Sequence, residues 1–477
     1  MTKISFSVLI LLFALTGIVS CKKDKVEESK PSSTTDRSEL TKDSIFYYAK
    51  EVYLWNSSLP TYAVFKPRGF NTSSNQLTNF NAELFAITRY SINSLTGKPY
   101  EYHAEYPNEN KFSYIDDSDV LGQIARTDKG SVDLDGKGND LGYSLVTLRS
   151  GNNFAVYFRY TSPGSPAYLA GLRRGDYINE VNGVRFGTNY NAEINSVRSI
   201  LNSAPNTIQL GGVKKNGNSF NVSLSKAQYD SSPIFKDSVL AVGNKKIGYL
   251  SYARFSNTAN SHDVLSDIFA KFSSDNVTDL IVDLRYNGGG FVHTARHLAN
   301  LIAPASLNGK VMFAEHFNAT MQSGRAAILR NQIVRDDNGN VEVENGRPVT
   351  YADYSYTVAN NTFKFDKIGP LDNVKKIVFI VSENTASASE LLINIFKPYL
   401  DVKIVGTKTY GKPVGFFSIR IDNYDIYYSM FTSKNSANQG DYYDGMVPDA
   451  VEQDDPTRDF GNTQELNIAK ALNYITT

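Results

Sequence analysis

Apolar and polar positions divide the chain into stretches with different periodicities. Residues 1–20 hold an apolar run, and residues 21–42 are rich in Ser, Thr and charged side chains. From residue 43, apolar side chains recur every three to four positions, which predicts a small helical N-terminal domain over residues 43–130. Residues 138–232 alternate short β-rich runs with turn residues, whereas residues 233–477 mix buried-type strands with helical patterns. The pattern predicts a multidomain α+β protein.

The predicted N-terminal domain opens with an amphipathic segment. Apolar residues recur at helical spacing over residues 45–55, and Thr41 or Asp43 can cap the start of this helix. Leu59-Pro60 is expected to end it, because the residue before a proline disfavours helical backbone. A second apolar stripe over residues 80–90 predicts another helix. No side chain in this domain indicates chemistry.

The last 245 residues or so carry the pattern of an α/β domain. Four short β-branched runs are typical of buried strands: IGYLSYA, TDLIVDL, KIVFIV and VKIVG. Helical patterns alternate with them: DVLSDIFAKF, HTARHLANLI and SASELLINIF. Asn338-Gly339 predicts a hairpin within an insertion, and residues 464–475 predict a final helix.

Composition narrows the classes of function. The 49 Lys and Arg residues are balanced by 49 Asp and Glu residues, so no global positive field exists and nucleic acid is not an expected partner. The hydrophobic content of 41% is that of an ordinary globular protein. A single cysteine, Cys21, excludes an intramolecular disulfide and a thiolate zinc cluster.

Cys21 ends a segment that has the layout of a secretory signal peptide. Its apolar run, Val8 to Leu15, is shorter than the roughly 20 residues that a membrane-spanning helix needs. IVSC resembles a bacterial lipobox, which implies removal of residues 1–20 and acylation of Cys21. Residues 21–42 have few apolar side chains to offset the entropy of ordering, which predicts a flexible tether. We therefore expect a lipid-anchored protein of the bacterial cell envelope. The alternative is ordinary secretion with an incidental cysteine.

Three segments of the α/β domain carry candidate chemistry. VSENTASASELL follows a strand, so residues 385–389 are expected on a turn at a helix N-terminus, where unpaired N–H groups favour negative charge. TYGKPVG places Lys412 in a Gly-flanked loop, and burial there would lower its pKa and let the amine accept a serine proton. DLRYNGGG ends a strand in glycines whose N–H groups can point at an oxyanion.

The β-rich middle part also carries a recognisable pattern. SPAYLAGLRRGDYINEVNGV resembles the signature of a PDZ domain, a partly open β-barrel. LGYS resembles its carboxylate-binding loop, which implies that a peptide terminus binds at Leu141, Gly142, Tyr143 and Ser144 and adds as a strand. The alternative is an inert β-rich spacer.

In this order, these segments resemble the C-terminal processing peptidases, also called tail-specific proteases, over about residues 140–450. The resemblance implies a catalytic domain of the crotonase-like type that cleaves polypeptides, with Ser387 as nucleophile and Lys412 as general base. It implies an oxyanion hole made by the N–H groups of Ala388 and of Gly288 or Gly289. It implies no metal and no other cofactor.

The chain departs from the family at the group that orients the lysine. Phe416 stands where family members often carry Gln, and Pro398 stands where others carry Asp. Asp401, Glu390 and Tyr410 are nearby in sequence, and the sequence does not choose among them. The absence of the family's usual orienting residue motivates an alternative, in which a noncatalytic lipoprotein of the same fold binds a peptide or another ligand.

Other candidates for chemistry are weaker. Ser389 and Ser382 are alternative nucleophiles, and Ser223 with Lys226 forms an SxxK pair within an alternating strand pattern. His293 and His297 are spaced i, i+4, which suits a metal, but no third ligand is apparent and packing is the favoured interpretation.

Overall fold

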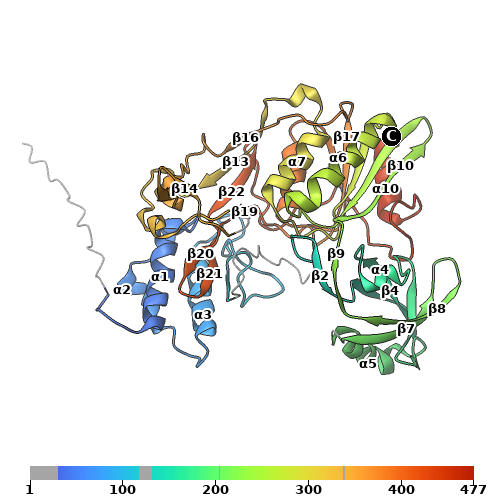
Figure 1. Cartoon of the computed structure of the whole chain (residues 1–477), viewed down its shortest axis with the longest axis horizontal. Helices are drawn as coiled ribbons and strands as arrows, with labels where there is room; N and C mark the ends of the chain where they lie inside the picture. Colours follow the sequence, from blue (N-terminus) through green and yellow to red (C-terminus); the bar gives the residue numbers. More distant parts are fainter. Residues whose placement is uncertain (1–30, 118–131, 204, 337–338) are drawn as a thin grey trace, which may run out of the picture.

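The structure is a computed structural model that describes residues 31–117, 132–203, 205–336 and 339–477. The predicted signal peptide, Cys21 and the first part of the predicted tether lie outside these ranges. Figure 1 shows three parts, with the N-terminal helices on the left, the PDZ-like module at lower right and the α/β domain above it. Within the described ranges, no helix has both the length and the apolar character that a bilayer-spanning segment requires.

The first helix begins earlier than the pattern predicts. Asp36 caps it, because Oδ1 of Asp36 accepts hydrogen bonds from the N–H groups of Ser38 (2.8 Å) and Glu39 (3.3 Å). The predicted caps Thr41 and Asp43 lie inside the helix, and the predicted tether of 21–42 is therefore too long. The helix also ends before Pro60. The helices of this part are α1 (Arg37–Val52), α2 (Tyr62–Phe65) and α3 (Gln76–Arg89), with short 3-10 turns at Asn56–Ser58 and Pro67–Gly69.

The helical region shares its core with the C-terminal part of the chain. Phe46 of α1 and Phe80 of α3 belong to the same buried cluster as Ile419 and Tyr428. Strand β1 (Tyr114–Asp116) pairs with β21 (Tyr424–Tyr427), which also pairs with β20 (Ile419–Ile421). Periodicity along a sequence does not reveal such distant partners, so the predicted helical domain of 43–130 is not an isolated unit.

The PDZ-like module is a twisted antiparallel sheet in the order β3-β4-β5-β7-β8, with β6 paired to β5. Strand β3 lies at its edge, where a further strand can add. Strands β2 and β9 pair with each other at the base of the module. Its elements are β2 (Lys137–Asp140), β3 (Tyr143–Ser150), β4 (Asn153–Thr161), α4 (Pro166–Leu169), β5 (Tyr177–Val181), β6 (Val184–Arg185), α5 (Tyr190–Asn202), β7 (Thr207–Val213), β8 (Ser219–Ser225) and β9 (Ala227–Asp230).

The α/β domain is built on a six-stranded sheet in the order β10-β11-β12-β17-β18-β23, in which all neighbours except β10 and β11 are parallel. Helices α6, α7 and α9 cover one face, and α10 covers the other. All four predicted strands belong to this sheet. Its elements are β10 (Ile234–Val242), β11 (Lys245–Tyr252), α6 (Thr258–Ser274), β12 (Asp279–Asp283), α7 (Val292–Ile302), β17 (Lys376–Val381), α9 (Ala388–Phe396), β18 (Asp401–Gly406), β23 (Ala450–Val451) and α10 (Leu466–Thr476).

A second sheet, β16-β13-β22-β19, packs against α9 and joins the helical region to the α/β domain. The insertion between β13 and β16 contains a hairpin that turns at Asn345-Gly346, both of which have positive φ. The predicted turn residue Asn338 lies outside the described ranges. The elements are β13 (Val311–Phe317), α8 (Ala319–Gln322), β14 (Val343–Glu344), β15 (Arg347–Pro348), β16 (Thr362–Lys364), β19 (Val414–Gly415) and β22 (Phe431–Asn435), with 3-10 turns at Ala305–Leu307, Ala327–Asn331 and Tyr351–Asp353.

Candidate active site

Ser387 lies on a sharp turn between strand β17 and helix α9. It precedes the first residue of α9 and has φ of +56°, a backbone conformation that favours glycine. A serine in such a conformation costs about 1–3 kcal/mol, which the surrounding contacts must offset. Its side chain is half-buried at the positive end of the helix dipole. The turn therefore presents the hydroxyl where developing negative charge is stabilised.

The other hydroxyls of this turn are engaged in structural hydrogen bonds. Thr385 Oγ1 donates to the carbonyl oxygen of Leu284 (2.8 Å), and Ser389 Oγ donates to that of Asn287 (3.0 Å). Ser382 Oγ donates to the carbonyl oxygen of Arg285. These bonds hold the serine turn, residues 382–389, against the segment that follows strand β12. They leave Ser389 and Ser382 poorly suited as nucleophiles.

Glu390 joins the serine turn to the lysine loop, which we define as residues 407–415. One oxygen, Oε2, accepts hydrogen bonds from the N–H of Ser387 (3.0 Å) and the N–H of Lys412 (2.8 Å). The other, Oε1, accepts from the N–H of Gly411 (2.7 Å) and the hydroxyl of Thr409 (2.5 Å). Burial raises the pKa of Glu390, whereas these donors favour its ionised form. Because one oxygen contacts both amides, the two predicted dyad residues are held side by side.

Lys412 is enclosed by the protein. Only 5% of it is exposed, and its Nζ lies 4.5 Å from the centroid of the Phe416 ring. Burial lowers the pKa of Lys412 from 10.5 to about 8, and the negative charges of Glu101 and then Glu390 oppose this lowering. A substantial fraction of Lys412 is therefore neutral near physiological pH, as a proton acceptor must be.

The glycine loop after strand β12 lies directly on the serine turn. A Cβ on Gly289 would come within 2.9 Å of the Cβ of Ser387, so only glycine fits there. The N–H of Gly289 donates to Oδ1 of Asn287 (2.9 Å) and is engaged within its own loop. This contact argues against Gly289 as an oxyanion donor. Gly288 and Ala388 stay predictions, and Ala388 occupies the first position of α9, where an N–H has no acceptor within the helix.

None of the three nearby candidates forms a hydrogen bond with the Lys412 ammonium that the structure records. Asp401 is exposed at the start of β18, where its nearest cation is Lys376 (3.9 Å). The Tyr410 hydroxyl donates to the carbonyl oxygen of Lys111 (2.8 Å), and Glu390 contacts backbone amides. The acidic residue with the largest influence on Lys412 is Glu101, which no local motif near Lys412 could reveal.

The predicted peptide-binding loop adjoins the edge strand β3. Gly142 has φ of +74°, and a Cβ there would lie 2.0 Å from the Cβ of Ser165. The carbonyl oxygen of Leu141 accepts a hydrogen bond from the N–H of Ala167 (3.1 Å), which ties the loop to helix α4. Tyr143 and Ser144 begin strand β3. The loop is thus built at the end of the strand to which a peptide would add.

The module is joined to the α/β domain by a buried arginine. Arg174 donates to the Tyr286 hydroxyl (2.7 Å) and binds the carboxylate of Asp454. Tyr286 lies two residues before Gly288, the first glycine of the glycine loop (residues 288–290). The PDZ-like module therefore contacts the segment that carries the candidate oxyanion donors.

The histidine pair of helix α7 packs against helix α6. The ring of His297 stacks on that of His262 at 3.8 Å, and the His293 ring lies 6.0 Å from that of His262. Among the residues that the structure describes, no group of three or more His, Cys, Asp or Glu side chains is arranged to hold a metal ion. The face-to-face stacking of His297 and the edge-on contact of His293 with the His262 ring support a packing role for this pair.

Comparisons with known proteins agree with this architecture. Residues 246–451 match Peptidase family S41, and residues 158–207 match a PDZ domain. A probable CtpA-like serine protease of Staphylococcus aureus is 27% identical over 258 residues, which cover 53% of this chain and 41% of that protein. A chloroplastic C-terminal processing peptidase of Tetradesmus obliquus is 25% identical over 283 residues, covering 56% of this chain and 50% of that protein. The chain thus aligns with half or less of each relative.

A solved structure extends the likeness to almost the whole chain. A putative S41 protease from Bacteroides fragilis superposes with a TM-score of 0.59, is 21% identical, and matches over 94% of this chain and 99% of that one. At this identity the match concerns the fold. It covers the helical region, the PDZ-like module and the α/β domain together.

Proposed function

We propose that this chain, which belongs to peptidase family S41, is a serine endopeptidase with Ser387 as nucleophile and Lys412 as general base. The observation that carries the proposal is the Glu390 carboxylate, which holds the amides of both residues on one oxygen. Burial of Lys412 supports it, because the lowered pKa of about 8 provides a neutral amine. The test is hydrolysis of an unfolded polypeptide by the wild-type protein and by its Ser387→Ala variant.

In the proposed reaction, neutral Lys412 Nζ takes the proton of Ser387 Oγ as Oγ attacks the scissile carbonyl carbon. The Ala388 N–H, at the start of α9, donates to the oxyanion that forms. The lysine ammonium then returns its proton to the leaving amine, which gives an acyl-enzyme. A water molecule hydrolyses this ester, with Lys412 again accepting and returning a proton.

Recruitment of a peptide C-terminus by the PDZ-like module is part of the proposal. Edge strand β3 and the loop at residues 141–144 support it, because together they offer a free strand edge and a backbone turn for a carboxylate. We expect amidation of a substrate's C-terminus to raise KM about 10-fold with little change in kcat, because the lost carboxylate contact affects binding rather than chemistry. Paired peptides with free and amidated ends provide the measurement. Equal KM values would contradict C-terminal recruitment.

Anchoring to the cell envelope completes the proposal and rests on the IVSC sequence at residues 18–21. We expect the expressed full chain to incorporate a fatty acid at Cys21 and to partition with membranes, because two or more acyl chains bind a bilayer stably. Radiolabelled palmitate and fractionation check this expectation, with Cys21→Ser as the matched variant. Equal labelling of the two proteins would contradict acylation at Cys21.

A further inference from the structure

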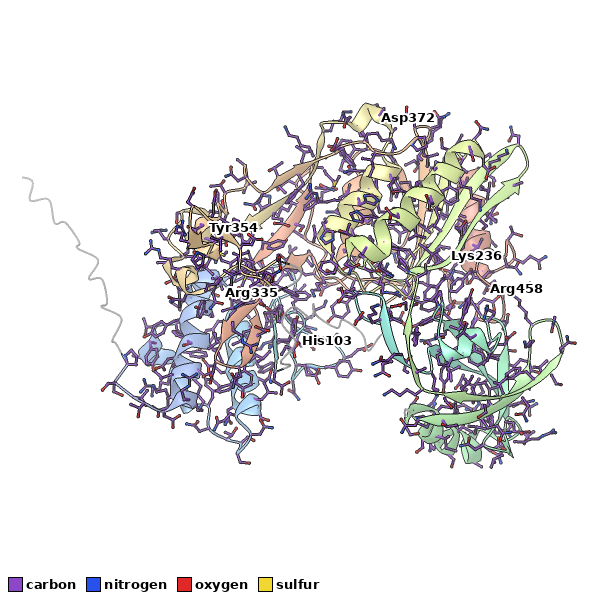
Figure 2. All side chains as sticks on the ribbon, in the orientation of Figure 1. His103, Lys236, Arg335, Tyr354, Asp372 and Arg458 are labelled. Atoms are coloured by element: carbon purple, nitrogen blue, oxygen red, sulfur yellow. The ribbon has the colours of Figure 1, made fainter. Side chains whose placement is uncertain are left out.

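A segment of the N-terminal region packs on the lysine loop. The Phe112 ring belongs to a buried cluster with Val414 of the lysine loop, and Tyr410 packs against this cluster. The Tyr410 hydroxyl bonds to the carbonyl oxygen of Lys111, and the ring of His103 lies 5.8 Å from the Tyr410 ring. Figure 2 labels His103, on the side of the N-terminal region that faces the rest of the chain. Residues 103–112, which follow Glu101 in the chain, thus include contacts with the lysine loop.

The side chain of Glu101 is fully buried within this contact. Its Oε1 accepts hydrogen bonds from the hydroxyls of Ser113 (2.6 Å) and Ser429 (2.9 Å). Its Oε2 accepts from the N–H groups of Ser113 (2.8 Å) and Phe112 (3.3 Å). All four donors are neutral groups, and the cation that interacts with Glu101 from the same region is Arg89. A charge on this buried carboxylate acts in a region that water does not screen.

The donors of Glu101 border the lysine loop on two sides. Phe112 belongs to the same buried cluster as Val414, and Met430, which follows Ser429, donates its N–H to the carbonyl oxygen of Gly415 (3.0 Å). This arrangement explains why Glu101 is the carboxylate that acts most strongly on the Lys412 ammonium, ahead of Glu390. Arg89 and Tyr53 are the other titratable groups that interact with Glu101.

We propose that Glu101 of the N-terminal region is the positioning residue for Lys412, and that it serves in place of the side chains missing at positions 398 and 416. The inference rests on the proposed function. The Glu101 charge stabilises the ammonium that forms when Lys412 takes the Ser387 proton, while the face of the Phe416 ring supports the same ammonium from 4.5 Å. The N-terminal region thereby contributes directly to the catalytic step.

The test is the pH dependence of kcat/KM for Glu101→Gln. Loss of the negative charge makes Lys412 less basic, so the midpoint of the acid limb should fall by about 1 pH unit. The kcat at high pH should fall about 10-fold because a weaker base transfers the proton less readily, and KM should change little. Glu83→Gln is the matched control, since Glu83 is also a fully buried acid of the N-terminal region. It should keep the wild-type midpoint.

Glu101→Asp is the second variant, because it keeps a charge but withdraws it by one methylene group. Its midpoint should move in the same direction as that of Glu101→Gln, by a smaller amount. Folding of each variant is judged by circular dichroism. An unchanged midpoint of the acid limb in a folded Glu101 variant overturns the role of Glu101. If the wild type then still shows Ser387-dependent cleavage, the proposed function is upheld. Wild-type protein without Ser387-dependent cleavage overturns both.

Discussion

Replacement of Ser387 by Ala is expected to reduce kcat/KM for an unfolded polypeptide on the order of 10⁴-fold or more, because covalent catalysis loses its nucleophile. The neighbouring hydroxyls cannot substitute, since those of Ser389 and Ser382 are committed to backbone carbonyl oxygens. Cleavage is measured by mass spectrometry of the products over a range of substrate concentrations. Thermal unfolding of the variant should match the wild type within a few degrees, because only one oxygen atom is removed.

Ser223→Ala is the matched control for this variant. Ser223 is an exposed residue on strand β8 of the PDZ-like module and belongs to the second serine–lysine pair of the chain. Its replacement should leave cleavage unchanged. Residual activity of Ser387→Ala close to the wild-type value would contradict the assignment of the nucleophile.

Replacement of Lys412 by Met should lower kcat about 10³-fold, because the general base is lost while the volume of the side chain is largely kept. For the wild type, the pKa of Lys412 near 8 sets the sign of the pH dependence. Lysine must be neutral to accept a proton, so kcat/KM should rise with pH and reach half its plateau near that value. Stopped assays in a series of buffers on both sides of about pH 8 provide the profile.

Lys226→Met, at an exposed lysine of the PDZ-like module, is the matched control for the lysine and should keep both the rate and the profile. If the acid limb of the wild-type pH profile had its midpoint near pH 10.5, the ordinary pKa of lysine, this would contradict a buried general base. A Lys412→Met variant that stays fully active would show that another group accepts the serine proton.

The local structure of contiguous segments was predictable from the sequence. Ser387 and Lys412 each lie in a short stretch whose local pattern, strand followed by turn, determines the geometry around them. The four parallel strands were also predictable, because buried strands are continuous apolar runs. An oxyanion donor in the glycine loop was implied by the family resemblance rather than by periodicity. Gly289 lies against Ser387, although its amide is engaged by Asn287.

Contacts between segments that are far apart in the sequence were not predictable. Glu101 acts on Lys412 from more than 300 positions away in the chain. The pairing of strand β1 with strand β21, which joins these two regions, leaves no mark in local periodicity. The start of helix α1 shows the same limit on a smaller scale, since Asp36, Thr41 and Asp43 are all acceptable caps and the tertiary contacts select the first. The sequence likewise does not distinguish Glu390, which binds the amides of Ser387 and Lys412, from Glu101, whose charge acts on the Lys412 ammonium.

The central claim is that Lys412 activates Ser387. Reaction with a fluorophosphonate, which forms a covalent bond only with an activated serine hydroxyl, followed by peptide mapping, tests it most directly. The account predicts one adduct, on Ser387, that forms in the wild-type protein and is slowed about 10³-fold in Lys412→Met. Absence of an adduct on Ser387, or labelling at an equal rate in the two proteins, would contradict it.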